Sequence, residues 1–254
     1  MRIKVINPNT TASMTEKIGE AARRVAARGT EIIAVNPSMG PVSIEGHYDE
    51  AIATVGLLEE VRRGDAEGVD GHVVACFGDP GLLAARELAS GPVLGIAEAA
   101  MHAASMIATG FSVVTTLGRT RAIAEELVLR YGMTRACRAI RATELAVLDL
   151  ERKGSDARRV ILEECRRALA EDHAEAIVLG CSGMADLADE IAAELRVPVI
   201  DGVGAAVKFT EALIGLGLGT SKAGGLAFPL EKPYLGPLAA FAPTPQRARA
   251  RRDA

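Results

Sequence analysis

The chain lacks tryptophan, and aromatic residues make up only 3 % of its 254 residues. This scarcity argues against proteins that stack nucleic-acid bases or sugars on aromatic side chains. The formal net charge is −4, so the chain has no general excess of positive charge for binding polyanions. One basic run, at residues 247–252, follows a proline-containing segment. We interpret it as a solvated tail and expect no nucleic-acid partner.

Long apolar runs and export signals are also missing. No stretch approaches the roughly 18 uninterrupted apolar residues that suggest a membrane span. The chain opens with a strand-like segment, residues 1–7, that has no apolar core of a secretory signal. We therefore expect a cytoplasmic protein without membrane attachment, whose cysteines stay reduced.

Metal and nucleotide motifs are absent as well. The four cysteines and four histidines form no CxxC pair and no mixed cluster, so we expect no metal site. Gly202 and Gly204 follow a strand-like segment, but the third glycine of a dinucleotide-binding fingerprint is missing. We expect no bound cofactor.

What the sequence does contain is a regular alternation of strand-like and helix-like segments. Strands are predicted at residues 3–6, 31–35, 93–96 and 111–116, and helices at about 49–62 and 97–108. A further helix is predicted after Thr10 or Thr11, with an apolar face formed by Met14, Ile18, Ala21 and Val25. A loop is expected at 36–48. Such alternation predicts right-handed βαβ units and parallel sheets, and hence an α/β fold.

Two segments of the chain repeat one pattern. Residues 72–96 and 176–202 each give a buried strand, a Cys-x-Gly turn, an amphipathic helix and a short strand that begins next to a proline. The repeat predicts two similar Rossmann-like, flavodoxin-like domains related by duplication. We place the first at 1–97 plus 211–236, the second at 98–210, and a C-terminal tail at 237–254. The cleft between the domains is the expected ligand site.

The repeat places one cysteine, Cys76 or Cys181, at the end of a strand in each half. Ligands of open α/β sheets bind beyond the carboxyl ends of the strands. Two thiols facing one ligand suggest that one removes a proton and the other delivers one to the opposite face. Most free cysteines are only small buried apolar residues, and we interpret Cys137 and Cys165 in that way.

Several stretches resemble the aspartate/glutamate/hydantoin racemase superfamily, and within it the hydantoin and allantoin racemase branch. They span residues 6–11, 43–50, 75–81, 115–119 and 180–184. The resemblance implies cofactor-independent inversion at a carbon next to a carbonyl group. It also implies that Cys76 and Cys181 exchange the roles of base and acid with the enantiomer, and that the enzyme forms homo-oligomers.

Residues near the two cysteines are candidates for binding a neutral, hydantoin-like ring. Asparagine amides can hold both a ring N–H and a ring carbonyl, although Asn-Pro-Asn also forms turns. Backbone N–H groups after each cysteine could bind a developing enolate oxygen. We further expect Asp79 and Ser182 to cap the helices that follow the cysteines. The candidate substrate contacts are Asn9, Ser43, Ile44, Phe77, Gly78, Thr115, Thr116, Ser182 and Gly183.

Other functions stay open at this point. In the branches of the superfamily that act on free acidic amino acids, the sequence at the first cysteine resembles Cys-Asn-Thr. The sequence at their second cysteine resembles Gly-Cys-Thr. Here Phe77 and Gly78 follow the first cysteine, which favours a neutral ring over glutamate. An arylmalonate decarboxylase-like or maleate isomerase-like enzyme is an alternative, and a two-domain binding protein without catalysis is another. The sequence does not select the hydantoin substituent, or hydantoin over allantoin.

Overall fold

The computed structural model describes residues 1–152 and 154–243, and the structural statements below refer to these ranges. The basic run at 247–252 lies outside them. Within these ranges the chain forms two four-stranded parallel sheets, ordered β2-β1-β3-β4 and β6-β5-β7-β8. The identical order in each half confirms the predicted α/β class with two similar parallel-sheet halves.

The strands are short and follow one another through helices. Those of the first sheet are β1 (Arg2–Ile6), β2 (Glu31–Val35), β3 (Gly71–Val74) and β4 (Val93–Gly95). Those of the second sheet are β5 (Phe111–Thr115), β6 (Cys137–Ala142), β7 (Ala176–Leu179) and β8 (Val199–Ile200).

The α-helices are α1 (Ala12–Val25), α2 (His47–Glu67), α3 (Leu82–Leu88), α4 (Ile96–Ile107), α5 (Arg121–Arg130), α6 (Ala157–Glu171), α7 (Ala188–Leu195) and α8 (Gly202–Gly215). Short 3-10 turns are η1 (Gly118–Thr120), η2 (Val147–Leu150), η3 (Ser182–Met184), η4 (Gly224–Leu226) and η5 (Gly236–Phe241). None of the helices in the described ranges combines the length and apolar character that a membrane crossing needs.

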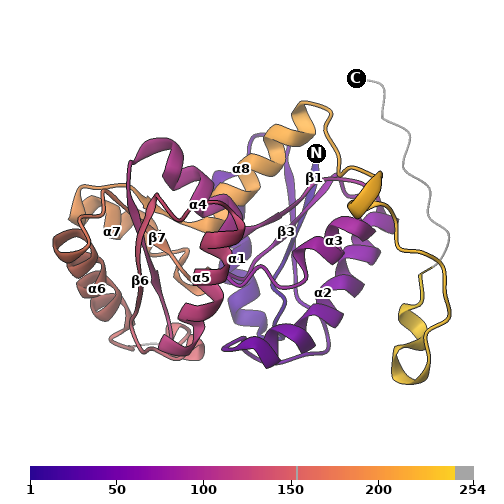
Figure 1. Ribbon diagram of the computed structural model, residues 1–254, viewed down its shortest axis with the longest axis horizontal. Coiled ribbons are helices and arrows are strands. Elements are labelled where there is room, and N and C mark those ends of the chain that lie inside the picture. The colour runs from indigo at the N-terminus through magenta and orange to yellow at the C-terminus, as the bar shows by residue number, and fades with distance from the viewer. Residues whose placement is uncertain (153, 244–254) are drawn as a thin grey trace.

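The helices form three layers around the two sheets (Figure 1). Helices α1, α4, α5 and α8 lie between the sheets and share one large apolar core with the inner sheet faces. Helices α2 and α3 cover the outer face of the first sheet, and α6 and α7 cover that of the second. The largest core is therefore shared between the halves, which fixes their relative placement.

Two helices cross from one half to the other. Helix α4 follows β4 of the first sheet but packs on β7 of the second, whereas α8 follows β8 and packs on β3 and β4. The predicted domain limits at residues 98 and 210 fall within these two crossing helices. The chain thus returns to the first half already at Gly202, before the predicted segment 211–236.

Local sequence signals explain most of the element limits. The predicted apolar face of α1 is confirmed, because Met14, Ile18 and Ala21 are buried. Helix α2 extends five residues past its predicted end and stops at Gly68, whose φ of 82° is readily adopted only by glycine. Strand β6 was not predicted, since its sequence alternates arginines with small apolar residues at a sheet edge.

Candidate active site

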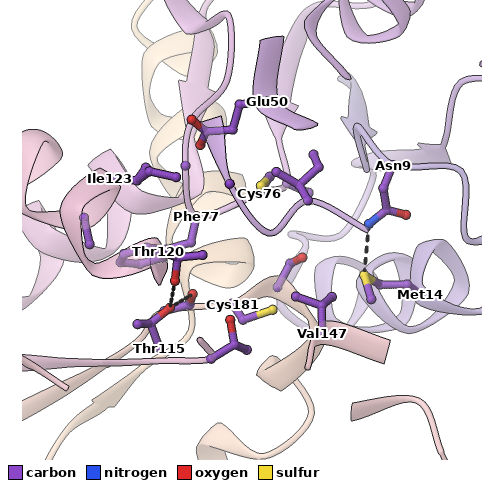
Figure 2. A pocket seen from close by; sticks show the side chains of 18 residues that line it. Asn9, Met14, Glu50, Cys76, Phe77, Thr115, Thr120, Ile123, Val147 and Cys181 are labelled. Carbon is purple, nitrogen blue, oxygen red and sulfur yellow. Dashed lines mark hydrogen bonds between the residues drawn. The ribbon is translucent and has the colours of Figure 1, made fainter. Parts of the chain in front are cut away.

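A pocket lies between the halves, at the carboxyl ends of the central strands, with about 570 Å³ of empty space including its mouth. Figure 2 shows the side chains around it. Of the predicted site residues, Ser43 and Gly183 do not line this pocket. Those that do are Asn9, Ile44, Cys76, Phe77, Gly78, Thr115, Thr116, Cys181 and Ser182.

Cys76 enters the pocket directly after β3, from the first half. Burial of the sulfur raises the pKa of the Cys76 thiol far above its ordinary value, while a hydrogen bond from the backbone N–H of Gly78 opposes the rise. The nearby carboxylates of Glu50 and Asp79 raise this pKa further. At neutral pH without a ligand, Cys76 is therefore a thiol, the form that delivers a proton.

Cys181 enters the pocket from the second half, after β7. Burial raises the pKa of its thiol to about 11, opposed by the backbone N–H of Gly183 and by the positive charge of Lys17. Gly183 thus acts on the sulfur through its N–H, although it does not line the pocket. Cys181 is the more readily ionised of the two pocket thiols, and the thiolate is the form that removes a proton.

The predicted helix caps after the cysteines are wrong. Asp79 adopts a left-handed φ of 45°, and α3 begins only after Gly81, which is its N-cap. The Asp79 carboxylate instead accepts hydrogen bonds from the N–H groups of Ala97 and Glu98, at 3.1 and 2.9 Å, and caps α4. Burial raises its pKa to about 6 in spite of these bonds.

Ser182 does not cap a helix either. It begins the 3-10 turn η3, whose N-cap is Cys181 and which has no side-chain cap. Ser182 is buried and lines the pocket. Ser182 thus belongs to the pocket wall rather than to a helix cap.

The two asparagines after β1 form the turn network that their sequence also predicted. Asn9 Oδ1 accepts hydrogen bonds from Asn7 Nδ2 and from the N–H of Thr11, both at 2.9 Å. Its Nδ2 donates to the sulfur of Met14 at 3.3 Å (Figure 2). Sulfur is a weak acceptor, so Asn9 keeps a donor at the pocket, while Asn7 is buried beside it and lies outside the lining.

Thr115, a predicted substrate contact, also has a structural role. Its hydroxyl donates to the carbonyl oxygen of Gly180 at 3.0 Å (Figure 2). This bond joins the ends of β5 and β7, next to Cys181. Thr116 follows it at the pocket wall and is also buried.

Most of the remaining pocket wall is apolar. Met14, Ile44, Phe77, Ile123 and Val147 contribute side chains from both halves. Water-poor walls strengthen hydrogen bonds and charges inside the pocket. They suit a planar, neutral ring with a substituent better than a free amino acid with two charges.

Polar contacts join the halves around the pocket. The hydroxyl of Tyr131, the residue that caps the C-terminus of α5, donates to Asp79 Oδ2 at 2.7 Å. On another side Lys17 Nζ lies 3.0 Å from Glu151 Oε1, and the loop residue Glu45 accepts a hydrogen bond from the N–H of Val147 at 2.9 Å. These contacts hold the two cysteine-bearing loops in a fixed relation.

Glu50 is a pocket residue that the sequence prediction missed as a functional residue. It lies in the first turn of α2 and lines the pocket near Cys76 and Gly78. Burial, followed by the charges of Asp79 and Glu126, raises its pKa to about 7. Acidic residues are common in the first turn of a helix, where they are stabilised by the helix dipole. Glu50 therefore could not be recognised from the sequence as a pocket residue.

In the described part of the chain, no group of three or more His, Cys, Asp or Glu side chains is arranged to hold a metal ion. The polar groups that converge on the pocket are the thiols, hydroxyls, one carboxyl group, an amide and backbone N–H groups. This set can exchange protons with an organic ring and hold its carbonyl and N–H groups.

A sequence model of the Asp/Glu/hydantoin racemase family matches residues 3–210. A hydantoin racemase of Pseudomonas sp. (strain NS671) is 51 % identical over 241 residues, which cover 95 % of this chain and 97 % of that protein. An allantoin racemase structure from Klebsiella pneumoniae has a TM-score of 0.94 and 61 % identity, covering 96 % of this chain and 100 % of the other.

An arylmalonate decarboxylase structure shares the fold, with a TM-score of 0.59 over 85 % of this chain and 93 % of the other, but only 17 % identity. The family match and the hydantoin racemase relative both extend over most of the chain. The chain belongs to the Asp/Glu/hydantoin racemase family.

Proposed function

We propose that this chain is a cofactor-independent racemase that inverts the C5 stereocentre of 5-substituted hydantoins, with allantoin as the second candidate substrate. The observation that carries the proposal is the placement of Cys76 and Cys181 in one pocket, each at the same point of a repeated half. The names of the relatives supply the substrate class: a hydantoin racemase and an allantoin racemase.

In the proposed reaction one cysteine, as thiolate, removes the C5 proton of the ring. The electron pair moves toward the adjacent carbonyl and gives a planar enolate. The other cysteine, as thiol, then delivers its proton to the opposite face and becomes a thiolate. In each turnover the thiolate therefore becomes a thiol, and the thiol becomes a thiolate. The protonation states that the two sulfurs have after one turnover are those that the reverse reaction needs.

The backbone supports charge at both sulfurs. The N–H groups of Gly78 and Gly183 each donate to the sulfur two residues earlier. A bond that lowers a thiol pKa stabilises the thiolate, and both sulfurs have such a bond. None of the described histidines lines the pocket to take the proton of either thiol. The buried thiolate therefore has to act as the base by itself, and the C5 proton of the hydantoin has to be acidic enough for a thiolate to remove it.

The test is polarimetry on each enantiomer of a 5-alkyl hydantoin, and of allantoin, with wild type, Cys76→Ser and Cys181→Ser. Wild type should abolish the rotation, and either serine variant should lose at least about 1,000-fold in rate because an alcohol is a far weaker acid and base than a thiol. Cys165→Ser is the matched control, since Cys165 is buried in the core around α6. Full activity of both pocket variants would refute the two-thiol reaction.

A decarboxylase-like reaction is the alternative that the shared fold leaves to be tested. It needs one thiol to protonate one face, and its substrate would be a malonate rather than a hydantoin. Release of carbon dioxide from an arylmalonate, without change in hydantoin rotation, would favour it. Binding of a hydantoin without any turnover would favour a non-catalytic binding protein.

A cytoplasmic location and a homo-oligomeric state remain further proposals. Support for the oligomer comes from the C-terminal segment, where the side chains of Leu230 and Leu235 are 82 % and 86 % exposed. Apolar side chains this exposed favour burial against another surface. Light scattering coupled to size-exclusion chromatography would test it, with a monomer mass as the contradicting result.

A further inference from the structure

The Glu50 carboxyl group is buried at the pocket without satisfying its hydrogen-bonding capacity. Only 17 % of its side chain is exposed, and its Oε1 atom is buried with no hydrogen-bond partner among the described residues. The His47 ring lies 3.9 Å from the other oxygen, Oε2, which is beyond hydrogen-bond distance. A buried polar atom without a partner is costly and calls for an explanation.

The backbone near Cys76 is shaped to admit this carboxylate. Gly78 has no side chain, and a Cβ atom built there would collide with Glu50 Oε1. A side chain at position 78 would therefore require the carboxylate of Glu50 to shift from this position. Gly78, predicted as a direct substrate contact, thus also makes room for Glu50, two residues after the catalytic candidate Cys76.

Glu50 lies between two cavities. It lines the active-site pocket, and it also lines an outer cavity together with His47, Asp79, Glu126 and Arg130. Figure 2 shows its carboxylate on the same side of the pocket as Cys76. One face of the group is therefore available to a ligand and the other to the charged residues behind it.

The hydrogen-bonding groups of the pocket differ in what they can offer a hydantoin ring. Asn9 Nδ2, whose partner is the weakly accepting sulfur of Met14, is a donor suited to a ring carbonyl. The ring also has two N–H donors, which need acceptors when they leave water. Among the described pocket-lining side chains Glu50 is the carboxylate, and an ionised carboxylate is the strongest such acceptor.

We propose that Glu50 binds the substrate through a ring N–H, which donates to the unpartnered Oε1, and thereby orients the C5–H bond toward the thiols. The N1–H group is bonded to C5 on the side away from the C4 carbonyl, whereas N3–H lies directly beside that carbonyl. Binding through N1–H would therefore keep the enolate charge that develops on the carbonyl oxygen away from the carboxylate. This assignment rests on the proposed hydantoin substrate and adds a binding residue to it.

Charged groups on every element around Glu50 set its protonation. Asp79 of the β3–α3 loop and Glu126 of α5 raise its pKa, after burial, to about 7, and Arg130 of α5 opposes them. His47 lies on its own helix, 3.9 Å away. Substrate binding through the carboxylate should therefore weaken as the pH falls through about 7, where Glu50 takes up a proton.

The experiment compares wild type with Glu50→Gln, using a 5-alkyl hydantoin and its N1-methyl and N3-methyl analogues. Glutamine keeps the shape but loses the charge, so we expect KM for the parent hydantoin to rise about tenfold with a smaller change in kcat. With the analogue whose methyl replaces the bound N–H, the two proteins should agree within about twofold. The analogue that restores this agreement identifies the nitrogen.

Two matched controls separate contact from charge. Glu126→Gln removes a carboxylate that acts on Glu50 from the exposed side of α5, without lining the active-site pocket. It should leave KM unchanged at pH 8 and move the pH dependence of KM downward, because a like charge is lost. Glu125→Gln, also exposed on α5, should change neither.

The outcomes are distinct. An unchanged KM in Glu50→Gln, or a Glu50→Gln effect that persists with both methylated hydantoins, overturns the assignment, provided that circular dichroism shows a folded variant. A pH-independent KM in wild type between pH 6 and 8 would also overturn it. Absence of racemisation by wild type itself would instead refute the proposed function.

Discussion

The two halves of the molecule place an acid at the start of the helix after their last strand, but they take it from different parts of the sequence. In the second half Asp201 directly precedes α8 and accepts hydrogen bonds from Val203 N and Gly204 N at 3.0 and 2.8 Å. In the first half the residue before α4 is Gly95, and the carboxylate comes from Asp79.

This difference connects one cysteine to the interface between the halves. Asp79 follows Cys76 by three residues, caps α4 and accepts the hydroxyl of Tyr131 from the second half. The two hydrogen bonds that Asp201 accepts in the described part of the chain both come from its own helix. The Cys76 loop is thus held by contacts of Asp79 with α4 and with Tyr131. At Cys181 the N–H of Gly183 and the charge of Lys17 across the cleft favour the thiolate.

The largest expected effect is that of Gly95→Ala. A Cβ atom at position 95 would collide with the Asp79 carboxylate, so the acid must leave the N-terminus of α4 and its N–H groups lose their acceptor. We expect a loss of about 2–4 kcal/mol in the free energy of unfolding, measured by urea denaturation. Gly215→Ala is the control, because no atom lies within 4 Å of a Cβ there.

Asp79→Ala and Asp201→Ala test this difference between the halves. Each should lose about 1–2 kcal/mol of stability through its cap, but only Asp79→Ala should also lower kcat, since it releases Tyr131 and the loop that carries Cys76. Equal kinetic effects of the two substitutions, each measured on a folded protein, would show that the loops are not held in different ways.

Lys17→Met should separate the two thiols. Lys17 lowers the pKa of Cys181 and is not among the groups that act on Cys76. Its loss should slow the alkylation of Cys181 by iodoacetamide about three- to tenfold at fixed pH, and leave Cys76 unchanged. Peptide mass spectrometry measures both sites. Arg24→Met, which also removes a contact between the halves, is the control that should not affect alkylation.

The smallest expected effect is on the pH dependence of stability. The pKa of Glu50 is raised to about 7 in the folded protein, from an ordinary value of 4.5, so the folded state binds the extra proton between these values. Stability therefore falls as the pH rises from about 4.5 to 7. Glu50→Gln should be more stable than wild type at pH 8, by on the order of 1 kcal/mol, and equal to it at pH 4. Thermal unfolding at both pH values measures the difference, and an equal shift at both would contradict the raised pKa.

The sequence allowed prediction of those features that repeat or that depend on neighbouring residues. The strand at Glu31–Val35 and the apolar face of α1 follow from short-range patterns, and the two sheets follow from the duplicated segments. The positions of Cys76 and Cys181 at strand ends were predictable for the same reason.

Features that depend on distant contacts were not predictable. Asp79 has the sequence context of a local cap, yet its partners Ala97 and Glu98 lie on another helix. Glu50 gains its position only because α2 packs over Gly78. In both cases the contact that determines the position of the side chain is made with a residue distant in the sequence. The residues next to Asp79 or Glu50 in the chain therefore do not predict it.

The most direct test of the two-thiol account follows one enantiomer of a 5-alkyl hydantoin in deuterated water. The reaction is stopped at about one tenth of complete conversion. The two enantiomers are separated, and mass spectrometry measures the deuterium content of each. Because different thiols remove and deliver the proton, the account predicts deuterium in the newly formed enantiomer and protium in the recovered starting enantiomer. Protium transferred into the product would mean that one group serves both faces, and would contradict the account.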